Sequence, residues 1–188
     1  MKKLLRLSVI AYLLFLMPVV TGYAQSGIFS DDSALISFFS SAPLEDISAE
    51  NTSVRAILNT RSGDIAVLVR IDRFSFKKRL MQKHFNEQYL ESDKYPEATF
   101  EGKIINFDLK DLGPEPEPYP VEGTLTIHGV KKDFKGSASI YILNNVIYGD
   151  TEFNVLLDDY KIKIPRLLIK NIAEEIKVNV KMIMERKQ

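Results

Sequence analysis

Residues 84–102, HFNEQYLESDKYPEATFEG, contain the change of pattern from which the fold can be predicted. Up to Leu90 the apolar residues recur at helical spacing, and the charged residues between them lie on the opposite face. Residues 92–96 end the helix, because the residue before a proline disfavours helical geometry. From Ala98 onward apolar and polar residues alternate, as in a half-buried strand. We therefore expect one short helix, over residues 76–90, that leads directly into a β-strand.

Alternation with a period of two continues through most of the remaining chain and predicts about eight or nine strands. The clearest segments are residues 65–71, 98–104, 121–127, 134–142, 147–155 and 176–184, and further segments lie at residues 34–40, 52–58 and 160–164. Short turn segments such as Asn144-Asn145 separate several of them, which favours antiparallel neighbours. Residues 108–120 contain four of the eight prolines and are predicted to form an exposed, extended loop.

Strands with one apolar face must either pack as two sheets or close into a barrel. Glycines occupy the apolar phase of four predicted strands, at Gly102, Gly123, Gly136 and Gly149. Glycines inside strands mark the bends and close approaches that closure requires. The pattern therefore favours a closed antiparallel barrel over a two-sheet sandwich.

A second motif, VEGTLTIHGVKKD at residues 121–133, follows the quoted stretch. The two motifs together resemble the signature stretches of the YceI-like family, exported bacterial lipocalin-like proteins that bind polyisoprenoids. The matching residues are His84, Leu90, Ser92, Lys94, Tyr95, Pro96 and Phe100, then Gly123, Leu125, Thr126, His128, Gly129, Val130 and Lys132. The resemblance is close over about residues 70–184 and weaker over residues 26–69. It implies an all-β fold, an antiparallel lipocalin-like closed barrel of about eight strands with one short helix.

The resemblance also implies a function, in which an exported protein holds a polyisoprenoid or similar long-chain lipid in the barrel lumen. A prenyl quinone or prenyl phosphate would be bound there as a ligand for transport, storage or sequestration, and no cofactor is expected. The inward phase of the strands predicts the ligand contacts, namely Phe100, Ile104, Leu125, Ile127, Phe134, Ala138, Ile140 and Phe153. Small residues beside large ones would leave room for the lipid, and the inward phase mixes Gly102, Gly123, Gly136, Ala98 and Ala138 with Phe100, Phe134 and Phe153.

An alternative remains open from the residues alone, because side chains fill the lumen of small eight-stranded barrels. The protein would then be a non-catalytic envelope or stress accessory protein that acts by protein contact. Residues 108–120 would be its natural contact surface.

The N-terminus has the features of a secretory signal peptide. Lys2, Lys3 and Arg6 precede an apolar run over residues 9–20, and Ala24 precedes the expected cleavage point. We expect residues 1–24 to be removed and residues 25–188 to form a single YceI-like lipid-binding domain, periplasmic or secreted. The apolar run is shorter than the roughly 20 residues of a spanning helix, so no stable membrane insertion is expected after cleavage.

Composition narrows the classes of partner. The chain has no net charge at neutral pH, and removal of the N-terminal basic residues leaves it mildly acidic, which argues against nucleic-acid binding. It has no cysteine, which excludes disulfides and a lipoprotein anchor. The sequence makes no prediction of the oligomeric state.

The two histidines, His84 and His128, are candidate metal ligands or catalytic residues. A zinc site draws at least three protein ligands, and the best available set, His84, Glu87 and His128, has no spacing that brings its members together. No nucleophile turn of the G-x-S-x-G type is present. We therefore predict no catalytic residues and no metal. The quoted stretch is interpreted as a helix-to-strand joint in which His84 bonds a backbone carbonyl.

Overall fold

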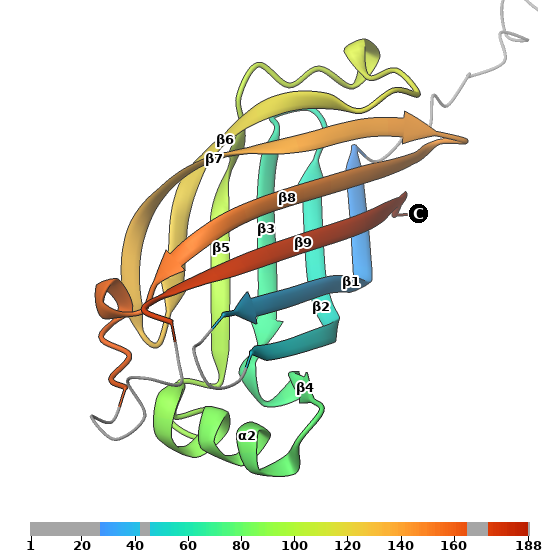
Figure 1. Ribbon diagram of the computed structural model, residues 1–188. Coiled ribbons are helices and arrows are strands. Elements are labelled where there is room, and N and C mark those ends of the chain that lie inside the picture. The colour runs from blue at the N-terminus through green and yellow to red at the C-terminus, as the bar shows by residue number, and fades with distance from the viewer. Residues whose placement is uncertain (1–26, 42–45, 165–172, 188) are drawn as a thin grey trace, which may run out of the picture.

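The computed structural model describes residues 27–41, 46–164 and 173–187, which form one antiparallel β-barrel (Figure 1). The strands are β1 (Ile28–Ser40), β2 (Ile47–Asn59), β3 (Asp64–Arg70), β4 (Ser75–Phe76), β5 (Glu97–Ile104), β6 (Glu117–Ile127), β7 (Val130–Leu143), β8 (Val146–Leu156) and β9 (Glu175–Arg186). Eight of these described strands surround the lumen in the order β1-β9-β8-β7-β6-β5-β3-β2, and pairing of β1 with β2 closes the ring. The predicted closed barrel with one short helix is therefore confirmed.

The alternation in the sequence becomes the two faces of the barrel wall. In β9 the side chains of Ile176, Val180 and Met182 are buried, whereas Lys177 and Lys181 between them are exposed. Residues directly opposite on β8 continue the same phase, so each strand contributes one apolar row to the lumen. The signal peptide predicted for residues 1–24 lies outside the described residues.

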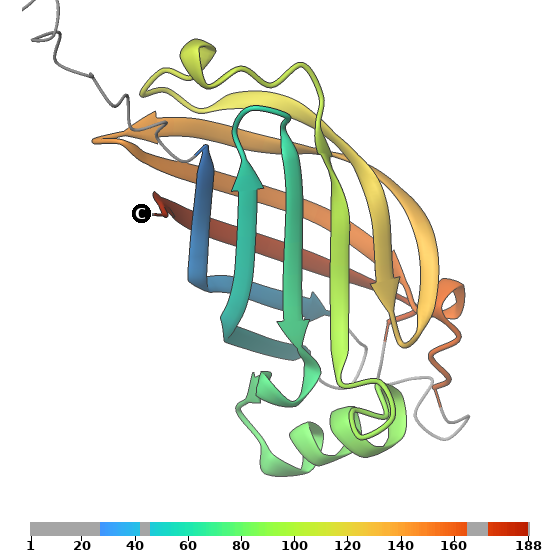
Figure 2. The ribbon, with the colours of Figure 1, turned by 180° about the vertical axis from the view of Figure 1, so that it is seen from behind.

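The barrel closes through bends in β1 and β2, which both change direction about halfway along their length (Figure 1, Figure 2). At the bend of β1, where the register shifts, the buried Asp31 carboxylate accepts hydrogen bonds from the backbone N–H groups of Ser33 at 2.8 Å and Ile183 at 2.6 Å. At the bend of β2, the buried Asn51 amide accepts from the Ser53 N–H and donates to the Arg70 carbonyl, both at 2.8 Å. Each side chain thus satisfies backbone groups that the bend removes from the strand ladder.

The bends make residues 27–41 and 46–69 part of the barrel, although this segment resembles the family only weakly. Segments predicted as short strands at residues 34–40 and 52–58 are in fact 13 residues long each. Strand β2 pairs with β4 before its corner and with β3 after it. Strand β1 keeps β2 and β9 as neighbours on both sides of its register shift, so both strands run through their bends without a break.

The helical segment begins later than predicted. Ser75 and Phe76 pair with β2 as the short strand β4, so α2 (Arg79–His84) starts only after them. A π-helical turn, η2 (Phe85–Tyr89), continues α2 up to Leu90. Three short 3-10 helices complete the described elements, η1 (Ile71–Arg73), η3 (Leu109–Asp111) and η4 (Asp158–Tyr160).

Two sequence predictions about the connections are corrected by the structure. The prediction of a strand around residues 160–164 is wrong. Lys161, which follows η4, has a left-handed φ of 57°, and the side chains of Tyr160 and Ile162 on either side of it are buried. The exposed loop predicted for residues 108–120 is only partly right, since β6 already begins at Glu117 and Leu112 is buried. Pro118 and Pro120 lie in the first part of β6, which pairs with β7 but not with β5. One edge of this part is therefore free of a strand partner among the described residues, so a residue without a backbone N–H is tolerated.

The turn between β6 and β7 explains part of the second sequence motif. His128 and Gly129 have positive φ angles of 52° and 71°, which suits the tight hairpin between these strands. The Tyr95 ring covers Gly129 so closely that a Cβ atom there would lie 2.7 Å from Tyr95 Cε1. The two motifs therefore meet in space at the end of the barrel where the helix lies.

Candidate functional site

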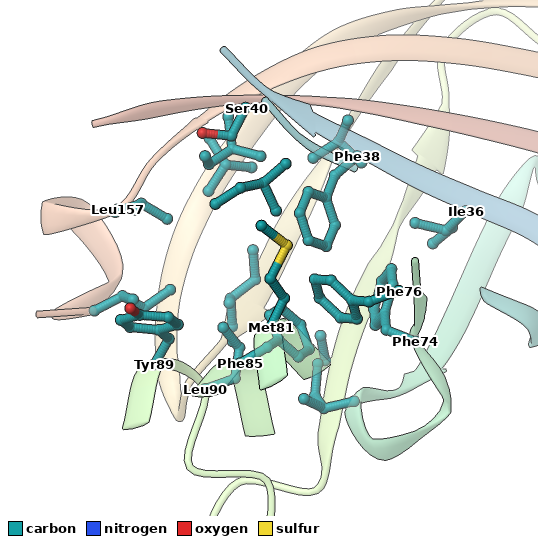
Figure 3. Close-up of a pocket in the computed structure, with 18 of the residues that line it drawn as sticks. Ile36, Phe38, Ser40, Phe74, Phe76, Met81, Phe85, Tyr89, Leu90 and Leu157 are labelled. Carbon is teal, nitrogen blue, oxygen red and sulfur yellow. The ribbon is translucent and has the colours of Figure 1, made fainter. Parts of the chain in front are cut away.

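A cavity of about 540 Å³ lies between the barrel end and the helical segment (Figure 3). Its volume is within the range of roughly 300–1,000 Å³ that small-molecule sites have. Among its described lining residues, only Ser40, Lys78, His84 and Tyr89 have polar side chains. The wall includes Ile36, Phe38, Phe74, Phe76, Met81, Phe85, Leu90, Ala98, Leu125, Phe153 and Val178. We call this space the helix-side cavity.

The π-helical turn orients the helix toward the helix-side cavity. The N–H of Leu90 donates a hydrogen bond to the Phe85 carbonyl at 2.9 Å, which spans five residues as in a π-helix. This turn places the side chains of Phe85 and Leu90 on the same face of the helix. Together with Tyr89 they line the cavity, and Met81 from the preceding turn projects into it (Figure 3). The π turn therefore gives a short helix a continuous apolar surface over the barrel end.

Aromatic contacts hold this helix in place. The Phe85 ring lies 5.6 Å from the ring of Phe38, 5.4 Å from that of Phe74 and 5.0 Å from that of Phe76, measured between ring centroids. These distances are in the range of favourable aromatic pairs. The α-helical part has only six residues and no side-chain cap at its start, so it depends on this packing.

A second, smaller cavity of about 100 Å³ lies deeper in the barrel. Phe134 packs edge-on against Phe100 at 5.4 Å and against Phe153 at 5.0 Å, and all three rings line this inner cavity. Phe153 and Leu125 also line the helix-side cavity, so the two spaces are neighbours along the barrel axis. The lumen is therefore widest beneath the helix and nearly filled farther in.

The glycines in the apolar phase do not leave the space that the sequence suggested. Gly102 and Gly123 are paired across β5 and β6, and a Cβ atom on either would lie within 2.9 Å of the Phe100 ring. A Cβ atom on Gly136 would lie 2.7 Å from Cζ of Phe134. The prediction that small residues make room for a lipid is thus wrong at these positions, because phenylalanine rings occupy the room.

All eight predicted contact residues line one of the two cavities. Phe100, Ile104, Leu125, Phe134, Ala138, Ile140 and Phe153 line the inner cavity, while Ile127 lines only the helix-side cavity. Their role as ligand contacts stays a prediction. The strand pattern missed the wall formed by Phe38, Phe74 and Phe76, although the F-S-F spacing of the latter two and the apolar face of the helix were visible in the sequence.

The two histidines have different surroundings, and His84 does not make the backbone contact predicted for it. The structure gives His84 no hydrogen bond among the described residues and places it in the cavity wall. His128 instead contacts a backbone carbonyl, with Nδ1 3.2 Å from the Tyr160 oxygen and Nε2 2.8 Å from a Glu91 carboxylate oxygen. The described residues contain no group of three or more histidine or acidic side chains that could hold a metal.

Two tyrosines at this end of the barrel have raised pKa values. Burial raises the pKa of Tyr89, which lines the helix-side cavity. Burial, and then the charge of Asp159, raise the pKa of Tyr160. The neutral form of Tyr89 is thereby favoured, which suits an apolar cavity. The arrangement offers shape and apolar contact to a ligand.

A closed antiparallel barrel with one helix over an apolar internal cavity is a lipocalin-like fold. The family model of the YceI-like domain matches residues 20–184, so this chain belongs to the YceI-like family, as its two motifs predicted. Within the described residues, the helices are too short or too polar to cross a membrane.

Solved structures with the same fold include a polyisoprenoid binding domain from Saccharophagus degradans implicated in plant cell wall breakdown. It has a TM-score of 0.74 and 15% identity, covering 87% of this chain and 100% of that one. BcnA from Burkholderia cenocepacia has a TM-score of 0.67 and 14% identity, covering 80% and 95%. The YceI protein of Campylobacter jejuni has a TM-score of 0.55 and 19% identity, covering 70% and 78%. No curated protein sequence matches this chain.

Proposed function

We propose that this protein is an exported carrier that binds a polyisoprenoid, or a similar long-chain lipid, with one end of the chain in the helix-side cavity. The observation that carries this proposal is the cavity itself, about 540 Å³ in volume and lined by apolar and aromatic side chains. Burial of a hydrocarbon chain there is favourable by roughly 25 cal/mol per Å² removed from water.

Three further observations support the proposal. A structural neighbour is a polyisoprenoid binding domain. The N-terminal sequence has the pattern of a signal peptide that would direct the protein out of the cytoplasm. The described part of the chain presents no constellation of acid, base and nucleophile at the cavity, so binding accounts for the site better than catalysis.

Bulk added inside the helix-side cavity tests the proposal. Ala98 on β5 lines both cavities, so Ala98→Phe places a ring in the space where the lipid would lie. Ala66 is an exposed alanine on the adjacent strand β3, so Ala66→Phe adds the same ring outside the barrel as a matched control. A steric conflict of about 1–3 kcal/mol between the added ring and the lipid would make binding to Ala98→Phe weaker by roughly five-fold to 150-fold.

Two measurements test this. The first is analysis of the lipid extracted from protein purified from its own host. The second is titration with an added prenyl quinone, followed by native mass spectrometry. We expect a bound lipid in the wild type and in Ala66→Phe, and less in Ala98→Phe. A wild type that carries no lipid and binds no prenyl quinone or prenyl phosphate would refute the carrier function. N-terminal sequencing of the exported protein should begin near Gln25.

A further inference from the structure

The helical segment carries basic residues at the mouth of the helix-side cavity. Residues 73–86 contain no acidic residue, and Lys77, Lys78, Arg79 and Lys83 fall within seven positions of one another. Lys77, Lys78 and Arg79 are exposed, and the Lys83 side chain is 63% exposed. We call these four residues the basic rim. They contrast with the rest of residues 25–188, in which acidic residues outnumber basic ones.

An apolar side chain is exposed at the same place. Leu80 lies within the basic rim and is 63% exposed, although it also lines the helix-side cavity. The mouth of the cavity is therefore bordered by cationic groups with Leu80 among them.

The position of the helix allows this surface to meet a flat partner. Both ribbon views show α2 beyond the ends of the barrel strands (Figure 1, Figure 2). The acidic groups nearest in sequence are already in contact with other groups, since Asp72 lies 3.3 Å from Arg70 and Glu91 lies 2.8 Å from His128. Glu87 lies 3.9 Å from Lys83, a surface distance at which an ion pair contributes little.

We propose that the basic rim docks this protein on the surface of an anionic lipid bilayer, with the mouth of the helix-side cavity facing the membrane. Lysine and arginine attract anionic lipid head groups, while a leucine among them enters the interface. A docked protein would exchange its lipid with the membrane without passing the chain through water. That consequence rests on the proposed carrier function, but the docking itself does not.

Vesicle binding measures the docking directly. Cosedimentation is performed with vesicles of phosphatidylcholine alone and with vesicles that contain phosphatidylglycerol in addition, at two salt concentrations. We expect binding only to the anionic vesicles, and weaker binding at high salt because the attraction is screened. Because the chain contains no tryptophan, Leu80→Trp supplies a fluorophore without background. Its emission should shift to shorter wavelength with anionic vesicles and stay unchanged with phosphatidylcholine.

Charge reversal at exposed positions outside the cavity lining tests the surface separately from the lipid site. Each basic residue near a membrane contributes about 1 kcal/mol, so the triple variant Lys77→Glu, Arg79→Glu, Lys83→Glu should bind roughly a hundred-fold more weakly or worse. The matched control reverses three exposed lysines elsewhere on the chain, with Lys103→Glu, Lys110→Glu and Lys187→Glu, and should keep most of its binding. Single changes to glutamine at Lys77 or Lys83 should give smaller, graded losses.

Several results would overturn the proposal. They are absence of vesicle binding, equal binding to phosphatidylcholine, or equal loss in the two triple variants. Competition by inorganic phosphate beyond that of chloride at equal ionic strength would also overturn it, because it would indicate a site for small anions. Prenyl quinone binding is measured separately in solution without vesicles. A protein that docks on vesicles but does not bind prenyl quinone refutes the carrier function alone. A protein that binds prenyl quinone but does not dock on vesicles refutes the docking alone.

Discussion

Replacement of Phe85 by leucine should release the helical segment while leaving the barrel folded. The Phe85 ring makes three aromatic contacts, at 5.0–5.6 Å, and each such pair contributes about 0.5–1.5 kcal/mol beyond the area that it buries. Phe85→Leu keeps an apolar side chain but removes all three pairs. We therefore expect the local free energy of opening of the helix to fall by about 2–4 kcal/mol.

Hydrogen exchange is the appropriate assay, because it resolves local opening from global unfolding. The amides of Leu90 and Ser92 donate to carbonyls of Phe85 and Asn86 and report on the helix. Their exchange should be faster by roughly 30-fold to 1,000-fold in Phe85→Leu, a factor of ten for each 1.4 kcal/mol. Amides in the pairing of β7 with β8 should be unchanged.

Phe107→Leu is the matched control, since Phe107 is also partly buried but makes a single ring contact, with Tyr119 at 6.2 Å. It should leave the exchange of Leu90 and Ser92 unchanged. If Phe85→Leu also leaves these amides as protected as in the wild type, the aromatic cluster does not hold the helix. Prenyl quinone release should be faster in Phe85→Leu if the helix covers a bound ligand.

Three further predictions concern the barrel. Gly123→Ala should destabilise the protein by about 1–3 kcal/mol in urea unfolding, because its Cβ would clash with the Glu101 carbonyl oxygen. Gly113→Ala should be neutral, because a Cβ there would meet nothing within 4 Å, and equal effects of the two changes would contradict the close approach at Gly123. Asn51→Ala should lower the free energy of unfolding by about 2–3 kcal/mol, because it removes both side-chain hydrogen bonds at the bend of β2. A loss below about 0.5 kcal/mol, as is typical of surface changes, would show that the bend does not need these hydrogen bonds. Because the pKa of Tyr160 is raised, the folded protein keeps the phenolic proton above about pH 10, where the unfolded chain loses it. The free energy of unfolding should therefore fall as the pH rises above about 10, and it should fall less steeply in Tyr160→Phe. Parallel pH profiles of the two proteins would refute this.

The sequence by itself determined most of the strands, the helix-to-strand joint and the family. Alternation of apolar and polar residues is a local property, because successive side chains of a strand point to opposite faces whatever lies around them. The helical spacing up to Leu90 and the break before Pro96 are equally local. The His128-Gly129 turn belongs to a sequence motif that could be recognised from the residue types alone, whereas its contact with Tyr95 could not be predicted from the sequence.

The tertiary structure alone decided how the barrel closes and where its open space lies. Asp31 and Asn51 are ordinary polar residues in the sequence, and only their buried bonds to β9 and to the end of β3 show that they form the corners. Phe38 and Phe85 are far apart in the chain, yet they enclose the helix-side cavity together. Glycines that suggested room for a ligand are instead covered by phenylalanine rings. A cavity is the space that remains after all side chains have packed, so it depends on contacts between distant residues that periodicity does not encode.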